Sequence, residues 1–174
     1  MTDWKDIRAI TLDVDGVMTD GSLLAFDSHE MVRVFNAKDS FGIRVALMRG
    51  LYVGVFSGGE TEGVYNRFIT CGMSPEDIHL GCRGKIKDFT EFCNLHGLKP
   101  SEVLYVGDDV PDVPVLQAAG IGCAPADAAQ DAVEASDYVC ENPGGCGCIR
   151  EVIEKVMRAK GLWHFEGDEY TSIF

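Results

Sequence analysis

The sequence predicts an α/β fold, a Rossmann-like doubly wound parallel sheet with a β-hairpin projecting from it. Short apolar runs alternate with amphipathic stretches along the 174 residues, as in proteins whose parallel strands are joined by helices. Asp13, Ser57 and Asp108 each come directly after such an apolar run. Because ligands of open parallel sheets bind at the carboxyl ends of the strands, these polar residues are expected to line a functional site.

Before its first helix, the sequence predicts one strand and a hairpin. Residues 9–12 form an apolar run that ends at Asp13 and predict a buried strand. Residues 17–36 contain two β-like runs that flank the turn-rich residues 27–30, which predicts the hairpin. A helix is expected from about residue 39 to 49, where Gly50 follows as a stop signal.

The remaining elements continue the alternation of strand and helix. Residues 51–56 predict the second core strand, and the small residues 57–59 predict a turn into a helix that runs through Cys71. A further helix is expected over 85–96, closed by Gly97. The later elements are a strand at 103–106, a helix near 113–119, short strands near 121–124 and 138–140, and a last helix at 149–160.

Length and composition favour one domain over residues 1–160, followed by a tail at 161–174. The net charge of −13 argues against nucleic acid and anionic membranes as partners, because both require a basic surface. No apolar run approaches the roughly 20 residues that span a bilayer, and the polar first residues do not resemble a signal peptide. The seven cysteines are an odd number scattered through apolar segments, which is typical of reduced thiols. A cytoplasmic protein is therefore expected.

The strongest chemical signal is a group of carboxylates at two strand ends. Asp13 and Asp15 follow the first strand, and glycines after them allow a sharp turn. Asp108, Asp109 and Asp112 follow a later strand. If the two strands are neighbours, several carboxylates converge, which is unfavourable unless a cation neutralises them. Oxygen ligands alone favour a hard ion, so the sequence predicts a Mg²⁺ site.

These motifs resemble the haloacid dehalogenase superfamily of phosphatases. The superfamily pattern is Asp-x-Asp on the first strand, Ser or Thr after the second, a later Lys, and an acidic pair after a further strand. The resemblance covers nearly the whole chain, with every motif in the expected order. The corresponding residues here are Asp13 and Asp15, Ser57, Lys85, and Asp108 with Asp109.

The resemblance implies a role for each carboxylate. Asp13 would attack phosphorus to form an aspartyl-phosphate, since a carboxylate needs no base to activate it. Asp15 would protonate the leaving oxygen and later deprotonate the attacking water. Mg²⁺ would be held by Asp13, the main-chain carbonyl of Asp15, and Asp108. Asp109 and Asp112 would hold these ligands in position without binding the metal themselves, although either side chain could instead serve only to cap a helix.

The same resemblance implies that Ser57, Gly58 and Lys85 hold the phosphoryl group. A hydroxyl after the second strand could instead be the N-cap of the following helix. Lys85 could be a solvated lysine at a helix start, with Lys87 as the functional residue. The spacing directs Lys87 to another side of the helix, which favours Lys85.

The spacing of the motifs leaves no room for the separate cap domain that many superfamily members use to enclose substrate. The hairpin or the tail of a neighbouring subunit would have to cover the site. This arrangement resembles the capless subgroup that contains the 3-deoxy-D-manno-octulosonate 8-phosphate phosphatases, which implies a homotetramer with shared sites and a role in lipopolysaccharide biosynthesis. The matching segments are 15–21, 57–59 with Arg67, 107–112, 144–151 and 159–163.

The motifs identify the type of reaction more clearly than they identify the substrate within this subgroup. Arg67 is the candidate for binding a substrate carboxylate, against the alternative of a surface arginine. Relatives that act on nine-carbon acids, such as 2-keto-3-deoxynononate 9-phosphate or N-acylneuraminate 9-phosphate, tend to have Glu at the position of Gly59 and a basic residue at that of Thr70. Their absence favours the eight-carbon sugar phosphate, with the nine-carbon acids as the alternative.

Other classes of protein fit the sequence less well. A receiver domain would carry its acidic pair first and its acceptor Asp later, which is the reverse of the order here. A non-catalytic regulatory or binding subunit would not need the complete set of motif residues. Cys146 and Cys148, with Cys140, lack the second ligand pair that a structural zinc site requires.

Overall fold

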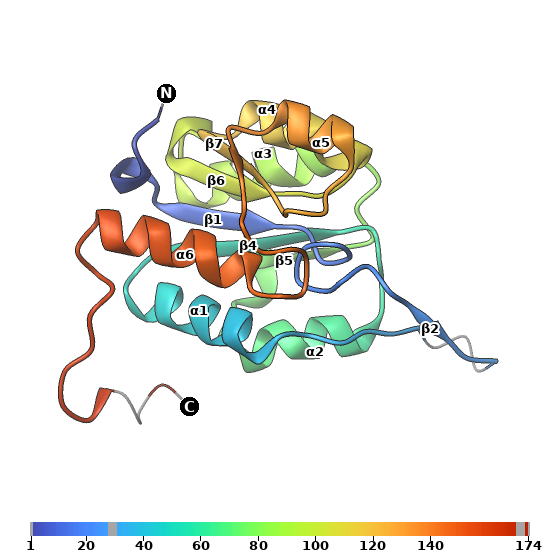
Figure 1. Cartoon of the computed structure of the whole chain (residues 1–174), viewed down its shortest axis with the longest axis horizontal. Helices are drawn as coiled ribbons and strands as arrows, with labels where there is room; N and C mark the ends of the chain where they lie inside the picture. Colours follow the sequence, from blue (N-terminus) through green and yellow to red (C-terminus); the bar gives the residue numbers. More distant parts are fainter. Residues whose placement is uncertain (1, 28–30, 170–172, 174) are drawn as a thin grey trace.

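The computed structural model describes residues 2–27, 31–169 and 173, and its main feature is a parallel sheet (Figure 1). The sheet has six strands in the order β5-β4-β1-β6-β7-β8, and every pairing between neighbours is parallel. This confirms the predicted doubly wound α/β fold. The strands are β1 (Ala9–Leu12), β4 (Tyr52–Ser57), β5 (Ile78–Leu80), β6 (Val103–Val106), β7 (Ile121–Ala124) and β8 (Tyr138–Val139).

Helices cover both faces of the sheet. The helices α1, α2 and α6 pack on one face, and α3, α4 and α5 pack on the other (Figure 1). All four residues of β1 are buried between these layers, as expected for a strand whose sequence is apolar apart from Thr11. The helices are α1 (Ala37–Met48), α2 (Glu62–Thr70), α3 (Lys85–His96), α4 (Val113–Ala118), α5 (Gln130–Ala135) and α6 (Cys148–Ala159).

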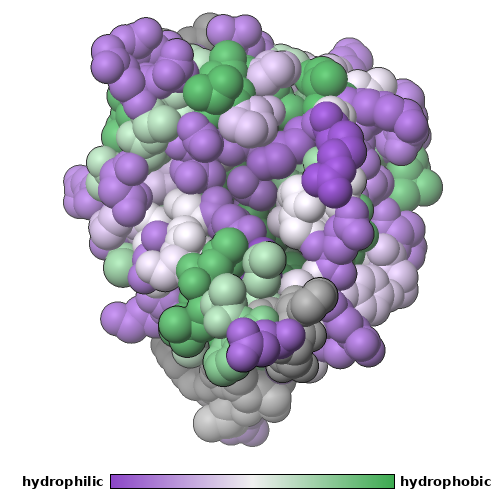
Figure 2. Space-filling view, turned by 90° about the vertical axis from the view of Figure 1, so that its right-hand side faces the viewer, coloured by the Kyte–Doolittle hydropathy of each residue, from purple (hydrophilic) through white to green (hydrophobic). Residues whose placement is uncertain are grey.

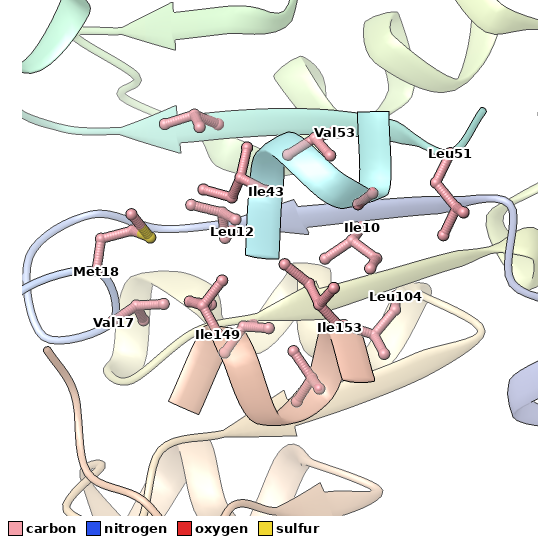
Figure 3. Packing of buried hydrophobic residues seen from close by; sticks show 14 of the residues in the cluster. Ile10, Leu12, Val17, Met18, Ile43, Leu51, Val53, Leu104, Ile149 and Ile153 are labelled. Atoms are coloured by element: carbon pink, nitrogen blue, oxygen red, sulfur yellow. The ribbon is translucent and has the colours of Figure 1, made fainter. Parts of the chain in front are cut away.

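The larger core lies between the sheet and the α1–α6 pair. Ile43 of α1 and Ile149 and Ile153 of α6 meet the side chains of Ile10 and Leu12 from β1 (Figure 3). All five side chains are fully buried, and each such burial contributes about 2 kcal/mol. This core fixes the direction of β1 and therefore the position of the residues that follow it.

The predicted hairpin is present as the two-stranded antiparallel sheet of β2 (Leu24–Ala25) and β3 (Met31–Val32). Its predicted turn at residues 27–30 lies mostly outside the described residues. The hairpin carries exposed apolar side chains, with Leu24 60% and Val34 75% exposed. Figure 2 shows apolar side chains gathered at the hairpin, below the hydrophilic face that lies at the carboxyl ends of the parallel strands.

The sequence predicted a tail at 161–174 that could reach a neighbouring subunit, and in its described part this tail packs on its own core. Trp163 and Phe165 pack against the α1–α6 core, and Ile173 is buried there. Arg150 of α6 stacks on the Trp163 ring at 4.5 Å, and Arg44 of α1 donates to the carbonyl of Ile173. The tail therefore covers its own subunit, on the side away from the carboxyl end of β1 (Figure 1).

Two elements were missed from the sequence, the edge strand β5 and the short helix α5. β5 is only three residues long, and its His79 interrupts the apolar pattern by which strands are recognised. α5 has six residues, too few to show a helical period. Four short 3-10 helices were also not predicted: Trp4–Asp6, Pro75–Asp77, Pro100–Glu102 and Val110–Asp112.

Candidate active site

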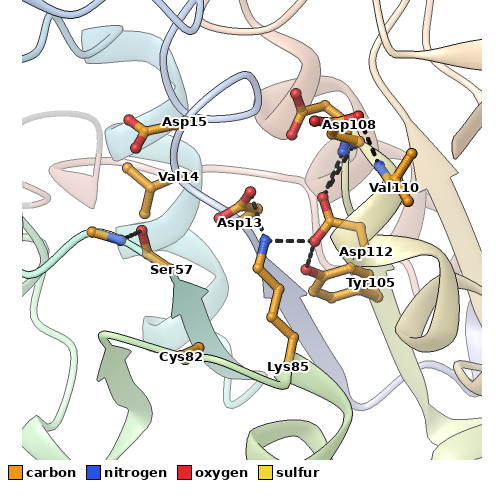
Figure 4. A network of polar contacts seen from close by, with 12 residues as sticks. Asp13, Val14, Asp15, Ser57, Cys82, Lys85, Tyr105, Asp108, Val110 and Asp112 are labelled. Atoms are coloured by element: carbon orange, nitrogen blue, oxygen red, sulfur yellow. Dashed lines mark hydrogen bonds and ion pairs between the residues drawn. The ribbon is translucent and has the colours of Figure 1, made fainter.

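Three neighbouring strands deliver the predicted polar residues to one cleft. Asp13 follows β1, Ser57 ends β4, and Asp108 follows β6, and these strands are adjacent in the order β4-β1-β6. The cleft has a volume of about 730 Å³ and opens on the hydrophilic face shown in Figure 2. Eight of the predicted site residues line this cleft, and Figure 4 shows most of them. They are Asp13, Asp15, Ser57, Gly58, Lys85, Asp108, Asp109 and Asp112.

Lys85 is the cation at the base of the cleft. It begins α3, and its ammonium lies 2.7 Å from Asp13 Oδ2 and 2.6 Å from Asp112 Oδ1. Burial alone would lower the pKa of Lys85, but the two carboxylates outweigh it and raise the pKa. Lys87 is directed to solvent, where its side chain is 80% exposed. The structure therefore brings Lys85 into the cleft and excludes Lys87.

Asp112 holds the loop after β6 in place. Its Oδ2 accepts hydrogen bonds from the main-chain N–H of Asp108 and Asp109, and its Oδ1 accepts from Lys85 and from the hydroxyl of Tyr105. Both oxygens are thus engaged within the protein. Asp109 is exposed and caps the 3-10 helix that follows, since its side chain accepts from the N–H of Val110.

The carboxylates of Asp13, Asp108 and Asp112 offer oxygens that all lie within 4.8 Å of one another. Burial, opposed in part by Lys85, raises the pKa of Asp13 to about 6. Burial and the charge of Asp13 raise the pKa of Asp108 to about 7. Asp108 Oδ1 is buried and has no hydrogen-bond partner among the described residues. Crowded oxygen donors with one unpaired buried oxygen fit a hard divalent cation.

Asp15 is held by a residue that the sequence did not identify as functional. Arg33, just after β3, donates from Nε to Asp15 Oδ1 at 2.6 Å and from Nη2 to Asp15 Oδ2 at 2.9 Å. Its Nη1 donates to the hydroxyl of Thr61 and to the carbonyl of Met31. The only signal in the sequence was a single cation within an apolar hairpin strand.

Ser57 belongs to β4 and does not cap the following helix. Its buried hydroxyl accepts from the N–H of Gly59 at 3.2 Å, while α2 begins only after Thr61. The alternative of an N-cap is therefore wrong, and the hydroxyl remains at the wall of the cleft. At Gly58 the nearest atom that an added Cβ would meet is the Cys82 carbonyl oxygen at 3.8 Å, so this part of the wall is open.

Arg67 lies outside this cleft. One of its terminal nitrogens donates to the hydroxyl of Ser40, and its Nε is buried without a partner among the described residues. Arg67 lines a second groove of about 430 Å³ between the hairpin and α2, together with Arg33 and Phe35. In the described part of the chain, the side-chain groups placed to hold a metal include no cysteine.

Comparison with known proteins places these features in a family. A family model described as haloacid dehalogenase-like hydrolase matches residues 82–148. The 3-deoxy-D-manno-octulosonate 8-phosphate phosphatase KdsC of Salmonella typhi is 36% identical over 163 residues, which cover 92% of this chain and 85% of the relative.

Solved structures agree with this comparison. The phosphatase of the same name from Yersinia pestis superposes with a TM-score of 0.88 at 30% identity, covering 91% of this chain and 85% of that one. The Moraxella catarrhalis phosphatase, solved in complex with magnesium ion, phosphate ion and KDO, gives a TM-score of 0.87 at 26% identity, with coverage of 91% and 90%.

Proposed function

The chain belongs to the haloacid dehalogenase-like hydrolase family, and from this premise we propose that it is a magnesium-dependent phosphatase of 3-deoxy-D-manno-octulosonate 8-phosphate. The observation that carries the proposal is the convergence of Asp13, Asp15, Ser57, Lys85 and Asp108 on one cleft, in a chain that resembles the KdsC phosphatases over nine-tenths of its length. The products are 3-deoxy-D-manno-octulosonate and inorganic phosphate. The reaction belongs to lipopolysaccharide biosynthesis.

The first step transfers the phosphoryl group to the protein. An oxygen of Asp13 attacks phosphorus, the new O–P bond forms, and the bond between phosphorus and the sugar oxygen breaks. The leaving oxygen receives a proton from Asp15. Asp13 can act as the nucleophile because Lys85 lies 2.7 Å from its carboxylate and stabilises the ionised form.

The second step releases phosphate. Asp15 takes a proton from a water molecule, the water oxygen bonds to phosphorus, and the bond to Asp13 breaks. Lys85 and the hydroxyl of Ser57 hold the phosphoryl oxygens through both steps, since both line the cleft beside Asp13. Gly58 leaves room for the phosphoryl group to approach the main chain.

Asp13 and Asp108, with the main-chain carbonyl of Asp15, would hold Mg²⁺, which neutralises charge between the nucleophile and the phosphate when bound. Asp112 stays outside this ligand set because both its oxygens are already engaged. Asp112 and Asp109 instead shape the loop that presents Asp108. The buried Oδ1 of Asp108, which has no hydrogen-bond partner among the described residues, supports its assignment as a ligand of the metal.

The protein is proposed to act as a homotetramer whose sites are completed by neighbouring subunits. Residues 1–160 would form the phosphatase domain, and its cleft is open on the face beside the hairpin (Figure 2). Exposed Leu24 and Val34 on that hairpin are unfavourable in water and support burial against another subunit. Arg67 is proposed to bind the carboxylate of the substrate from the groove next to the hairpin.

We place the protein in the cytoplasm. All seven cysteines are free thiols, which suits a reducing compartment. No helix in the described part of the chain is long and apolar enough to cross a membrane. We propose a small sugar phosphate as its partner, and the net charge of −13 argues against nucleic acid and anionic membrane surfaces.

The test is a phosphate-release assay with Mg²⁺ on three classes of substrate. The eight-carbon acid phosphate should be hydrolysed with the highest kcat/KM, and nine-carbon acid phosphates and simple aldose phosphates with lower values. A higher kcat/KM for a nine-carbon acid phosphate would reassign the substrate while leaving the chemistry unchanged. The absence of phosphate release from all three classes would refute the proposal.

A further inference from the structure

Arg33 lies at the boundary between the catalytic cleft and the groove beside the hairpin. It touches Asp15 and Gly59, which line the cleft, and itself lines the groove together with Arg67. Its side chain is only 4% exposed, whereas that of Asp15 is 33% exposed. The buried guanidinium of Arg33 therefore lies between the two spaces, paired with the carboxylate expected to act as acid and base.

This pairing conflicts with the part that Asp15 plays in the reaction. Both oxygens of Asp15 accept hydrogen bonds from Arg33, in the bidentate geometry that is the strongest for such a pair. Each oxygen keeps a second lone pair, but the leaving oxygen of the substrate must then share Asp15 with the guanidinium. Opening one arm of the bidentate contact would free an Asp15 oxygen for phosphoryl transfer.

A buried guanidinium does not release its carboxylate without a replacement. Removing the partner would leave an uncompensated charge, which is strongly unfavourable at a site as enclosed as that of Arg33. An anion that arrives with the substrate would be such a replacement. The sugar acid has a carboxylate at the end of the molecule opposite the phosphate, and the groove into which Arg33 faces is the space beyond the catalytic cleft.

We propose that Arg33 is a specificity-determining latch: it engages Asp15 in the free enzyme and transfers to the carboxylate of the substrate, which releases Asp15 for catalysis. This inference rests on the proposed function for its substrate. Gly59 provides the space for the guanidinium, because a Cβ at that position would lie 3.0 Å from Arg33 Nη2. A phosphate ester that has no carboxylate cannot open the latch and is turned over slowly.

The experiment compares two alkyl phosphates that need the same help from an acid. One is 3-deoxy-D-manno-octulosonate 8-phosphate, and the other is glycerol 3-phosphate, which has no carboxylate. In Arg33→Met, kcat/KM for the sugar acid phosphate should fall by about 20-fold or more, as expected for loss of a charge-assisted bidentate contact. For glycerol 3-phosphate, kcat should rise about threefold, because a partly exposed ion pair no longer occupies Asp15.

Three further variants separate the latch from a general effect of charge or folding. Arg8→Met removes a cation that pairs with Glu102 beside the opposite, amino end of β1, and both activities should stay unchanged. Arg33→Lys keeps the charge without the fork and should fall between wild type and Arg33→Met on both substrates. Gly59→Ala keeps Arg33 but displaces its guanidinium, so it should shift the ratio of the two activities in the same direction even if Arg33→Met does not fold.

The outcomes are distinct. An equal loss on both substrates in Arg33→Met and Gly59→Ala would show that Arg33 only positions Asp15 and would overturn the latch, as would no change on either. If the wild type does not hydrolyse the sugar acid phosphate, the proposed function fails. The glycerol 3-phosphate measurement then decides the latch, because only a latch predicts a gain of activity when Arg33 is removed or displaced.

Discussion

Replacing Asp108 by Asn should make the metal-free protein more stable at neutral pH. The folded state raises the pKa of Asp108 from its ordinary value of 3.8 to about 7, through burial and the neighbouring charges of Asp13 and Asp112. A raised pKa means that the folded protein binds the proton more tightly than the unfolded chain. The favourable contribution is therefore complete below pH 3.8 and is lost as the pH rises through about 7.

The size of the effect follows from that difference in proton affinity. At about 1.4 kcal/mol for each tenfold change, the rise from 3.8 to about 7 has an upper limit of about 4 kcal/mol. Asp108 is only half-buried, so solvent screening reduces the expected gain in unfolding free energy to about 1–2 kcal/mol. For a chain of 174 residues this corresponds to about 3–6 °C in Tm.

The assay is thermal and urea unfolding of wild type and Asp108→Asn in excess chelator at pH 7.5, 6 and 4.5, repeated at pH 7.5 with Mg²⁺. The variant should be more stable at pH 7.5, and its advantage should shrink as the pH falls. Mg²⁺ should stabilise the wild type and have little effect on the variant.

Asp109→Asn is the matched control, because it removes the same charge from an exposed neighbour and an Asn can still cap the helix. A variant that is less stable than wild type in chelator at pH 7.5, or a gain that is the same at every pH, would refute the reasoning.

Three further predictions concern the nucleophile, the hairpin and the tail. Asp13→Asn should abolish phosphate release, by 10³-fold or more as an order of magnitude, in a protein whose circular dichroism is unchanged; near-normal turnover would rule out Asp13 as the nucleophile. Leu24→Asp on the hairpin should reduce the mass measured by sedimentation at micromolar concentration, since an apolar residue that is 60% exposed in one subunit is best explained by an interface; a wild type that is monomeric and fully active would contradict shared sites. Deleting residues 161–174 should lower the unfolding free energy by about 3 kcal/mol or more, because Trp163, Phe165 and Ile173 pack on the core; a truncated protein as stable as the full chain would show that this packing contributes little.

The sequence predicted which residues converge on the cleft because the relevant information is local. Asp13, Ser57 and Asp108 each follow a strand that is recognisable from its own apolar residues, and parallel strands carry such residues to the same edge. Lys85 could be chosen over Lys87 because helical spacing separates the faces of α3. Spacing along the chain was sufficient in these cases.

The contacts that cross between distant segments could not be predicted in this way. Arg33 meets Asp15 only because the hairpin folds back over the loop after β1, and no periodic pattern encodes that approach. Arg67 was expected to contact substrate, but which space it lines depends on how α2 packs beside the hairpin. The packing of the tail was not predicted because Trp163 and Phe165 belong to no helical or strand pattern, yet an irregular segment can bury aromatic rings as well as a helix can.

The charges of the cleft explain how so acidic a protein can bind a phosphate ester. Asp13, Asp108 and Asp112 face one ammonium group, that of Lys85, so the ionised cluster keeps two negative charges, while Asp15 and Arg33 neutralise each other. One divalent cation cancels those two charges, and the incoming phosphate then meets a neutral site in which Lys85 and Ser57 are positioned to donate to it. If Arg33 leaves Asp15 for the substrate carboxylate, it neutralises the negative charge that this carboxylate brings. The net charge of −13 belongs to the whole chain, and local cations such as Lys85 can reverse the field inside one cleft.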